Sequence, residues 1–257
     1  MVNVYPISPI SYSFIHIGKT AGTSIKLSLN KSSIKSIYHQ KRPDLLTHAD
    51  EKFFLVLRNP VDRIISAFNH CKLVAEFELN DLNPDELNIH NCPAPWRLRR
   101  KFKNKLRHAY SPEFEKLLFS FRDENEWGEA LALDCISKKK DMAIDLLKFP
   151  KDNIFKGIGW YLRNGKFVRN NSEKIVHVGS VENIEETYKF LSDHGLLRSG
   201  LLNLPSRRKN IHRPSLGLTK KIRNKFVELL LPTDYQALIA LVEANKISVD
   251  LLQSYMH

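Results

Sequence analysis

The sequence contains little cysteine, and its cysteines form no recognisable pattern. Only three are present, Cys71, Cys92 and Cys135, and no two of them form a Cys-x-x-Cys pair. An odd number of widely spaced cysteines indicates neither a disulfide framework nor a zinc site. We therefore expect the protein to reside in a reducing compartment.

Long hydrophobic segments are also missing. No run of about 18 apolar residues occurs, and the N-terminal residues lack the basic and apolar regions of a secretory signal peptide. Internal repeats and low-complexity blocks are absent from the sequence as well. These absences favour a soluble, cytoplasmic protein.

Acidic residues are few relative to basic ones. The 257 residues include 40 Lys and Arg but only 28 Asp and Glu, which gives a formal charge of +12. Because charge of one sign repels itself, an anionic partner is expected: a nucleotide-like cofactor, an acidic glycan, nucleic acid or a membrane surface. The length suits one large domain with a buried core, so we predict a single domain over residues 1–257.

The order of the apolar segments predicts the fold class. Residues 12–17 and 34–39 have strand character, and 52–57 is a continuous apolar run, as in a central parallel strand covered on both faces. Helical spacing begins at Thr23 after the first strand and at Val61 after the third. This alternation predicts an α/β three-layer sandwich with a central parallel sheet.

The rest of the chain is mainly helical in pattern. Residues 113–149 are expected to be helical, 174–184 to form a late strand followed by a turn and a helix, and the chain from about Thr219 to be helical with a break at Pro232. Residues at about 80–112 are polar and basic, and we interpret them as an excursion from the core.

The turn after the first strand, GKTAGTS, is suited to binding a tetrahedral anion. Backbone N–H groups of residues 19–24 can cradle a phosphate, with Lys19 as a point charge and the hydroxyls of Thr23 and Ser24 as donors. The spacing is not that of a Walker A loop, because Ser13 stands where that motif has its first glycine. An ordinary strand-to-helix turn with a Ser/Thr cap is the alternative.

A second anion site is predicted in LRNPVDRIISAF, directly after the most apolar strand. Asn59 is a good helix N-cap, and Pro60 then occupies the first helical position. Arg58 and Ser66 are eight residues apart, about 2.2 helical turns, so they can face the same side and hold a second phosphate. Arg63 is expected to cap or pair nearby.

The second loop also lacks a residue that a kinase needs. A kinase or ATPase of this architecture has an aspartate at the end of the neighbouring strand, where it holds Mg²⁺. Here the run FFLVLR ends in Arg58. We therefore predict no metal in the site, and a P-loop-type kinase that uses ATP and Mg²⁺ is kept as an alternative function.

The two loops together resemble those of a known family. FIHIGKTAGTS followed by FFLVLRNPVDRIISAF is similar to the 5′-phosphosulfate and 3′-phosphate loops of PAPS-dependent sulfotransferases, and most similar to carbohydrate enzymes related to heparan sulfate 2-O-sulfotransferase and their bacterial counterparts. The resemblance covers residues 12–70. It implies a P-loop-NTPase-like sulfotransferase fold for the whole chain, and Gly18 departs from the family because many relatives carry proline there.

The resemblance also implies a reaction and a set of binding residues. The expected reaction is metal-free, in-line transfer of a sulfuryl group from PAPS to a hydroxyl of a carbohydrate acceptor, with PAP as product. Lys19 is expected to contact the leaving oxygen and the sulfonate. The expected donor-binding residues are Gly18, Lys19, Thr20, Ala21, Gly22, Thr23 and Ser24 for the 5′-phosphate, Arg58 and Ser66 for the 3′-phosphate, and Arg208, Lys209 and Arg213 in a C-terminal basic lid. A solvated basic loop is the alternative for that lid.

The acceptor hydroxyl needs a general base. His39 is the first candidate, because it ends the second predicted strand at the carboxyl edge, where open parallel sheets bind ligands. His48, ten residues before Arg58, is the alternative.

The segment RLRRKFKNKLRH, residues 97–108, allows three interpretations. Its interleaved apolar and basic residues form a basic amphipathic helix that grips an anionic glycan acceptor, rests on an anionic membrane as a peripheral contact, or only presents a solvated face.

A non-enzymatic nucleic-acid-binding protein is a third function, motivated by the charge. It leaves both loops unexplained and has no recognised binding motif, so we do not expect nucleic acid as a partner.

Overall fold

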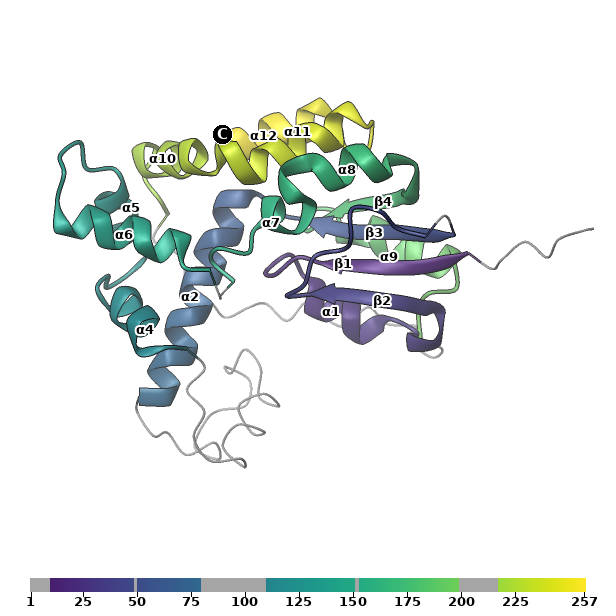
Figure 1. Cartoon of the computed structure of the whole chain (residues 1–257), viewed down its shortest axis with the longest axis horizontal. Helices are drawn as coiled ribbons and strands as arrows, with labels where there is room; N and C mark the ends of the chain where they lie inside the picture. The colour runs from purple at the N-terminus through teal and green to yellow at the C-terminus, as the bar shows by residue number, and fades with distance from the viewer. Residues whose placement is uncertain (1–9, 49, 80–109, 151–152, 199–216) are drawn as a thin grey trace, which may run out of the picture. The chain divides into compact units, whose positions relative to one another are not determined.

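The computed structural model describes residues 10–48, 50–79, 110–150, 153–198 and 217–257 (Figure 1). The predicted lid residues Arg208, Lys209 and Arg213 and the basic segment 97–108 lie outside the described residues. Within the described part, no helix has both the length and the apolar character needed to cross a membrane.

Four parallel strands form the sheet. Their bounds are Ser11–His16 for β1, Ile34–His39 for β2, Glu51–Leu57 for β3 and Ile175–Ser180 for β4. The strand order is β2-β1-β3-β4, and every neighbouring pair is parallel. The predicted strands are confirmed, and all four carboxyl ends lie at one edge of the sheet.

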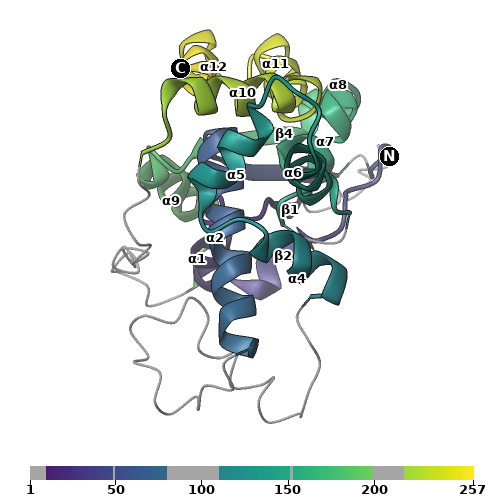
Figure 2. The same ribbon diagram turned by 90° about the vertical axis from the view of Figure 1, so that its left-hand side faces the viewer.

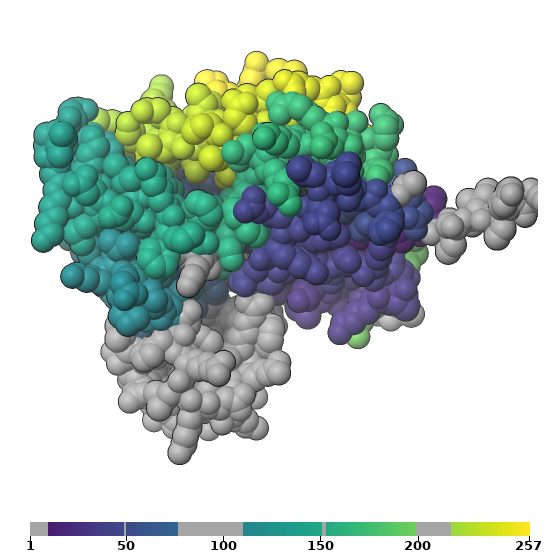
Figure 3. Space-filling view, in the orientation of Figure 1, coloured from purple at the N-terminus to yellow at the C-terminus, as the bar shows by residue number. Residues whose placement is uncertain are grey.

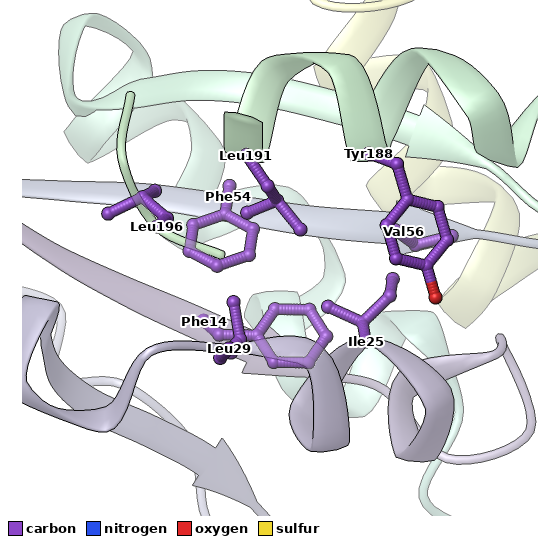
Figure 4. Close-up of a cluster of buried hydrophobic side chains, with 8 residues drawn as sticks. All are labelled: Phe14, Ile25, Leu29, Phe54, Val56, Tyr188, Leu191 and Leu196. Atoms are coloured by element: carbon purple, nitrogen blue, oxygen red, sulfur yellow. The ribbon is translucent and has the colours of Figure 1, made fainter. Parts of the chain in front are cut away.

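Helices cover both faces of the sheet. On one face, α1 (Gly22–Ser28) and α9 (Ile184–Asp193) enclose a core that includes Phe14 and Phe54, stacked with ring centroids 4.9 Å apart (Figure 4). Neighbouring side chains of a strand point to opposite faces. Phe53 accordingly meets Phe167 of α8 (Lys166–Asn171) on the other face, at 5.2 Å. The fold is therefore α/β, with a central parallel sheet flanked by helices.

The chain divides into two compact units. The first holds the sheet and comprises Met1–Arg63, Lys156–Ser206 and Leu229–His257; the second comprises Ile64–Phe155 and Arg207–Glu228. The sequence predicts one domain over residues 1–257. Contacts between residues separate a helical group from the sheet unit, because the chain segments that lie between those of the sheet unit pack mainly with one another.

The second unit is built from helices. Within it run most of α2 (Pro60–Leu79) and α10 (Lys220–Leu230), and all of α4 (Pro112–Phe119), α5 (Glu124–Leu131) and α6 (Lys138–Lys148) (Figure 2). The predicted helical character of residues 113–149 is confirmed. Trp127 of α5 contacts three other helices of the unit. Its ring centroid lies 5.1 Å from those of Phe68 and Phe226, and its indole N–H donates to the carbonyl of Ala143 at 3.1 Å.

A buried ion pair supports the sheet unit behind the carboxyl edge. Arg63 is fully buried and lies 3.6 Å from Asp234, whose other carboxylate oxygen accepts a 2.8 Å hydrogen bond from the backbone of Gly159 in α7 (Ile158–Leu162). Asp234 belongs to a π-helical turn, Leu231–Tyr235, which follows α10 and contains Pro232. The expected break at Pro232 is thus a widened turn, since proline cannot donate a ladder hydrogen bond.

The pair between Arg63 and Asp234 gives a stability prediction. Asp234→Ala removes the carboxylate partner of a buried guanidinium, so we expect the free energy of unfolding to fall by about 3–5 kcal/mol. Glu243→Ala is the control, because its pair with Arg169 is about half exposed and worth only about 0–1 kcal/mol. Urea unfolding of both variants checks this, and equal losses would contradict the assigned role of the pair.

Candidate functional site

The turn between β1 and α1 has an unusual backbone. Lys19 and Ala21 have positive φ values of 70° and 58°, whereas Thr20 between them does not. The left-handed region costs a non-glycine residue roughly 1–2 kcal/mol, so such residues persist only where their surroundings hold them. Alternation of this kind turns successive N–H groups toward one concavity, the nest found in phosphate-binding loops. The turn therefore has left-handed residues on both sides of Thr20, and its binding of a phosphate stays a prediction.

Side chains cap the start of α1 less than the sequence suggests. Ala21 occupies the N-cap of α1 and no side chain caps the helix, so the expected Ser/Thr cap is wrong. An ordinary strand-to-helix turn stays the alternative to a phosphate loop. The first helical hydrogen bonds run from Ser24 and Ile25 to the carbonyl of Ala21. The hydroxyls of Thr23 and Ser24 are exposed. Thr20 is buried and donates its hydroxyl to the carbonyl of Ile17 at 3.0 Å, which fixes the turn.

Arg58 joins the second loop to the first. It follows β3, is half-buried, and donates from Nη1 to the carbonyl oxygen of Lys19 at 3.4 Å. The contact arises because β1 and β3 are parallel neighbours, so residues that follow the two strands meet at one edge. The structure thus brings the guanidinium of Arg58, from the second loop, to the backbone of the first loop.

The position of Arg58 is fixed by the helix cap that follows it. Asn59 Oδ1 accepts hydrogen bonds from the backbone N–H groups of Val61 at 2.9 Å and Asp62 at 3.4 Å, so the predicted N-cap of α2 is confirmed. Its Nδ2 donates to the carbonyl of Tyr255, in α12 (Val249–Met256), at 3.2 Å. Asn59 is buried, and this network leaves little freedom at the end of β3.

Ser66 is a buried residue whose polar atom is unsatisfied. It lies in the part of α2 that belongs to the helical unit, with 5% of its surface exposed, and its hydroxyl has no hydrogen-bond partner in the described part of the structure. An unsatisfied buried hydroxyl costs about 1–3 kcal/mol, and a ligand oxygen would remove that cost. The pairing of Ser66 with Arg58 stays a prediction.

His39 lies beside a second histidine that sequence reasoning missed. His16 ends β1 and is in register with His39 at the end of β2; their rings stack with centroids 4.2 Å apart. The ring of His16 also stacks on Phe14 at 5.5 Å and is only 3% exposed, so it is fixed between its neighbours. The only sequence signal for His16 is that it is a polar residue within the apolar run just before Gly18.

Gly22 connects the histidine pair to the turn between β1 and α1. A Cβ atom at this position would overlap the ring of His16, with Cδ2, Nε2 and Cγ as the nearest atoms. The residue must therefore lack a side chain for the ring to pack where it does. The turn after β1, His16 and His39 therefore form one continuous cluster at the carboxyl edge.

His48 lies at the other end of β3. It is exposed, and its carbonyl accepts from the N–H of Glu51, the first residue of that strand. Seven strand residues span roughly 20 Å at about 3.3 Å each, which separates His48 from the edge that carries Arg58. The structure therefore does not bring His48 to the predicted site, whereas it does bring His39.

Tyr255 is another residue that the sequence does not reveal. Its hydroxyl donates to the carboxylate of Glu182, which follows β4, at 3.0 Å. Burial raises the pKa of Tyr255, and the negative charges of Glu182 and Asp62 raise it further, whereas Arg58 lowers it. The hydroxyl therefore stays protonated and acts as a donor. Through its carbonyl, which also accepts from Tyr235 at 2.7 Å, Tyr255 ties α12 to this edge.

Basic residues follow or end the strands around β1. The strands on its two sides lead into His39 and Arg58, and Lys19 follows β1 itself. Among the described residues, no three His, Cys, Asp or Glu side chains form a group that could hold a metal ion. The arrangement combines hydrogen-bond donors with the two stacked imidazole rings of His16 and His39.

Comparison of the chain with family models, with curated proteins and with solved structures finds no match. Its function is therefore inferred from the site itself and from the resemblance of the two loops.

The contact between Gly22 and His16 can be tested by a thermodynamic cycle. We expect Gly22→Ala to destabilise the protein, and to cost on the order of 1–2 kcal/mol less in a His16→Ala background, because the obstructing ring is gone. Urea unfolding of the four proteins measures this coupling. Gly128→Ala is the control, since its Cβ would meet Ile222 instead and its cost should be additive with that of His16→Ala. A Gly22→Ala cost that is equal in both backgrounds would refute the contact.

Proposed function

We propose that the protein is a PAPS-dependent sulfotransferase with a P-loop-like sulfotransferase fold, acting on a hydroxyl acceptor. The observation that carries the proposal is the meeting of two basic loops at one sheet edge, through the hydrogen bond from Arg58 to the carbonyl of Lys19. His39 lies on the neighbouring strand at the same edge. A donor with two separated anionic ends suits this pair of loops.

The residues present fit such a donor. The nest around Lys19 and Ala21 offers backbone N–H groups to a 5′-phosphosulfate. Arg58 offers a guanidinium to a 3′-phosphate, and Ser66 is kept in the proposed set on the resemblance of the loops alone. The donor-binding set proposed here comprises Gly18, Lys19, Thr20, Ala21, Gly22, Thr23, Ser24, Arg58 and Ser66, with Thr20 contributing through its backbone.

The proposed chemistry is an in-line displacement at sulfur. PAPS, when bound, supplies a sulfuryl group whose bond to the 5′-phosphate oxygen breaks as a bond to the acceptor oxygen forms. His39 accepts the proton of the acceptor hydroxyl as that bond forms. Lys19 stabilises the negative charge that develops on the phosphate oxygen as the electron pair moves there. The other residues of the turn hold the reacting groups in line.

His16 is proposed to be a positioning residue for His39. Its ring is held by Phe14 on one side and by the close approach of Gly22, so it offers a fixed surface against which the ring of His39 stacks. Fixing the imidazole orientation keeps its nitrogen directed at the acceptor oxygen, which in-line transfer requires. A carbohydrate is proposed as acceptor on the resemblance of the loops alone.

Two charge-removing variants test the donor site. Lys19→Ala and Arg58→Ala each remove a charged hydrogen-bond donor, so we expect PAP to bind at least tenfold more weakly, since such a bond is worth about 1.5–3 kcal/mol. Turnover of PAPS with a pool of oligosaccharides should be lost in both variants. Isothermal titration with PAP and transfer of radiolabelled sulfuryl groups measure the two effects.

Lys31→Ala is the matched control, because Lys31 is an exposed cation that precedes β2, at the opposite edge of the sheet. We expect its affinity for PAP and its melting temperature to equal those of the wild type. Retained turnover in Lys19→Ala or Arg58→Ala, or an equal loss in Lys31→Ala, would refute the assignment of the site.

A further inference from the structure

Arg58 of the second loop has no carboxylate partner among the described residues. It is half-buried, and its one hydrogen bond to a described residue is the contact of Nη1 with the carbonyl of Lys19, whose 3.4 Å is longer than the usual range. None of the ion pairs between described residues includes Arg58. A half-buried guanidinium in this condition attracts any anion within its reach.

A carboxylate follows the neighbouring strand at the same edge of the sheet. β3 and β4 are parallel, with Leu57 in register with Ser180, and the N–H of Val181 donates to the carbonyl of Leu57 at 2.9 Å. Neighbouring strands lie about 4.8 Å apart, so the residues that follow these positions are side by side. They are Arg58 after β3 and the exposed Glu182 after β4, which carry opposite charges.

Glu182 nevertheless bonds to a tyrosine. Tyr255 is only 3% exposed and donates its hydroxyl to Glu182 Oε2 at 3.0 Å. Burial raises the pKa of Tyr255 and the charge of Glu182 raises it further, whereas the charge of Arg58 lowers it. The hydroxyl therefore stays a donor, and it lies within the electrostatic reach of the glutamate and the arginine together.

Asp62 is a second acidic residue in this region, but its charge has another source of stabilisation. It lies in the first turn of α2, where the helix dipole favours a negative charge. Its backbone N–H donates to Asn59 Oδ1 as part of the helix cap. Tyr255, in contrast, is the one hydrogen-bond partner of the Glu182 carboxylate among the described residues. Glu182 is therefore the acidic group whose position depends on the tyrosine.

Tyr255 reaches Glu182 from a fixed position. Its carbonyl accepts from Asn59 Nδ2 at 3.2 Å and from the hydroxyl of Tyr235 at 2.7 Å. The helix that carries it, α12, packs on α11 (Gln236–Glu243), and α11 packs on α8. The space-filling view shows the yellow C-terminal segment directly against the green segment that includes α8 (Figure 3). The hydroxyl is thus held by the body of the sheet unit.

We propose that Tyr255 is a positioning residue that keeps the Glu182 carboxylate from pairing with Arg58, so that Arg58 stays available to an anionic oxygen of the ligand. The inference rests on the proposed function, because it takes Arg58 as the group that binds the 3′-phosphate of PAPS. Without the hydroxyl, Glu182 forms an internal ion pair with Arg58 that a ligand phosphate must displace. The C-terminal helix thereby sets the affinity of the second loop for its anion.

Calorimetric titration of PAP into three variants of the full chain tests the inference. Tyr255→Phe removes the hydroxyl and keeps the ring, so we expect its affinity for PAP to fall at least fivefold. Glu182→Gln keeps an acceptor for the hydroxyl and removes the competing charge, so its affinity should equal or exceed that of the wild type. Tyr255→Phe/Glu182→Gln should bind as tightly as Glu182→Gln alone, because no carboxylate is left to occupy Arg58.

Tyr235→Phe is the matched control for a loosened C-terminal helix. It removes the hydroxyl that donates to the carbonyl of Tyr255 and leaves the contact of Tyr255 with Glu182 in place. We expect its melting temperature to fall while its affinity for PAP equals that of the wild type. A merely structural role of Tyr255 predicts instead that Tyr235→Phe also loses affinity and that Glu182→Gln restores none.

A second measurement needs no ligand. Urea unfolding gives the coupling between Arg58→Ala and Glu182→Gln, which we expect to be larger in a Tyr255→Phe background than in the wild type, because the internal ion pair forms only there. Equal coupling in both backgrounds would overturn the inference whether or not PAP binds.

The two measurements together separate this inference from the proposed function. The larger coupling in a protein that does not bind PAP would support the role of Tyr255 and refute the sulfotransferase proposal. PAP binding that Tyr255→Phe leaves unchanged, or that Tyr235→Phe weakens as much, would refute only the role of Tyr255.

Discussion

The parallel pairing of β1 with β2 on one side and with β3 on the other determines which residues meet at the carboxyl edge. It places His16 level with His39, and it brings the Lys19 turn to the end of β3. A slip of one residue in either pairing would turn the strand's side chains to the opposite faces and separate these groups. The apolar side chains on both faces, such as Phe53 and Phe54, fix that register because neither can be exposed without losing its buried contacts.

The turn after β1 adds a local constraint to this framework. Two non-glycine residues, Lys19 and Ala21, adopt a left-handed backbone, and the buried hydroxyl of Thr20 fixes the turn between them. Gly22 then allows the ring of His16 to approach the start of α1. Strain of this kind is concentrated at functional sites, where the surrounding structure maintains it. Here it produces a turn with two left-handed residues and a histidine pair that is held in one orientation.

Much of the fold could be predicted from local patterns. The strands were evident from apolar runs, and the cap at Asn59 from the residues beside it, because both depend on neighbours in sequence. The absence of a side-chain cap on α1 could not be predicted, since alanine has no preference for the left-handed conformation that Ala21 adopts at the N-cap. His16 was missed because its importance comes from cross-strand register. The hydrogen bonds from Gln40 to the Tyr161 hydroxyl and from Asn59 to the Tyr255 carbonyl join residues 121 and 196 positions apart, and no local sequence pattern indicates such pairs.

The central claim is that the site holds a donor with two separated phosphate groups and needs no metal ion. The most direct measurement is the melting temperature of the full chain with PAP and, separately, with ATP and Mg²⁺, each in large excess. A ligand at 100 times its dissociation constant adds roughly 2.7 kcal/mol of stability, which raises the melting temperature of a chain of this size by several degrees. The account predicts a rise with PAP and none with ATP and Mg²⁺. A rise with ATP and Mg²⁺ alone would contradict it and indicate a kinase loop.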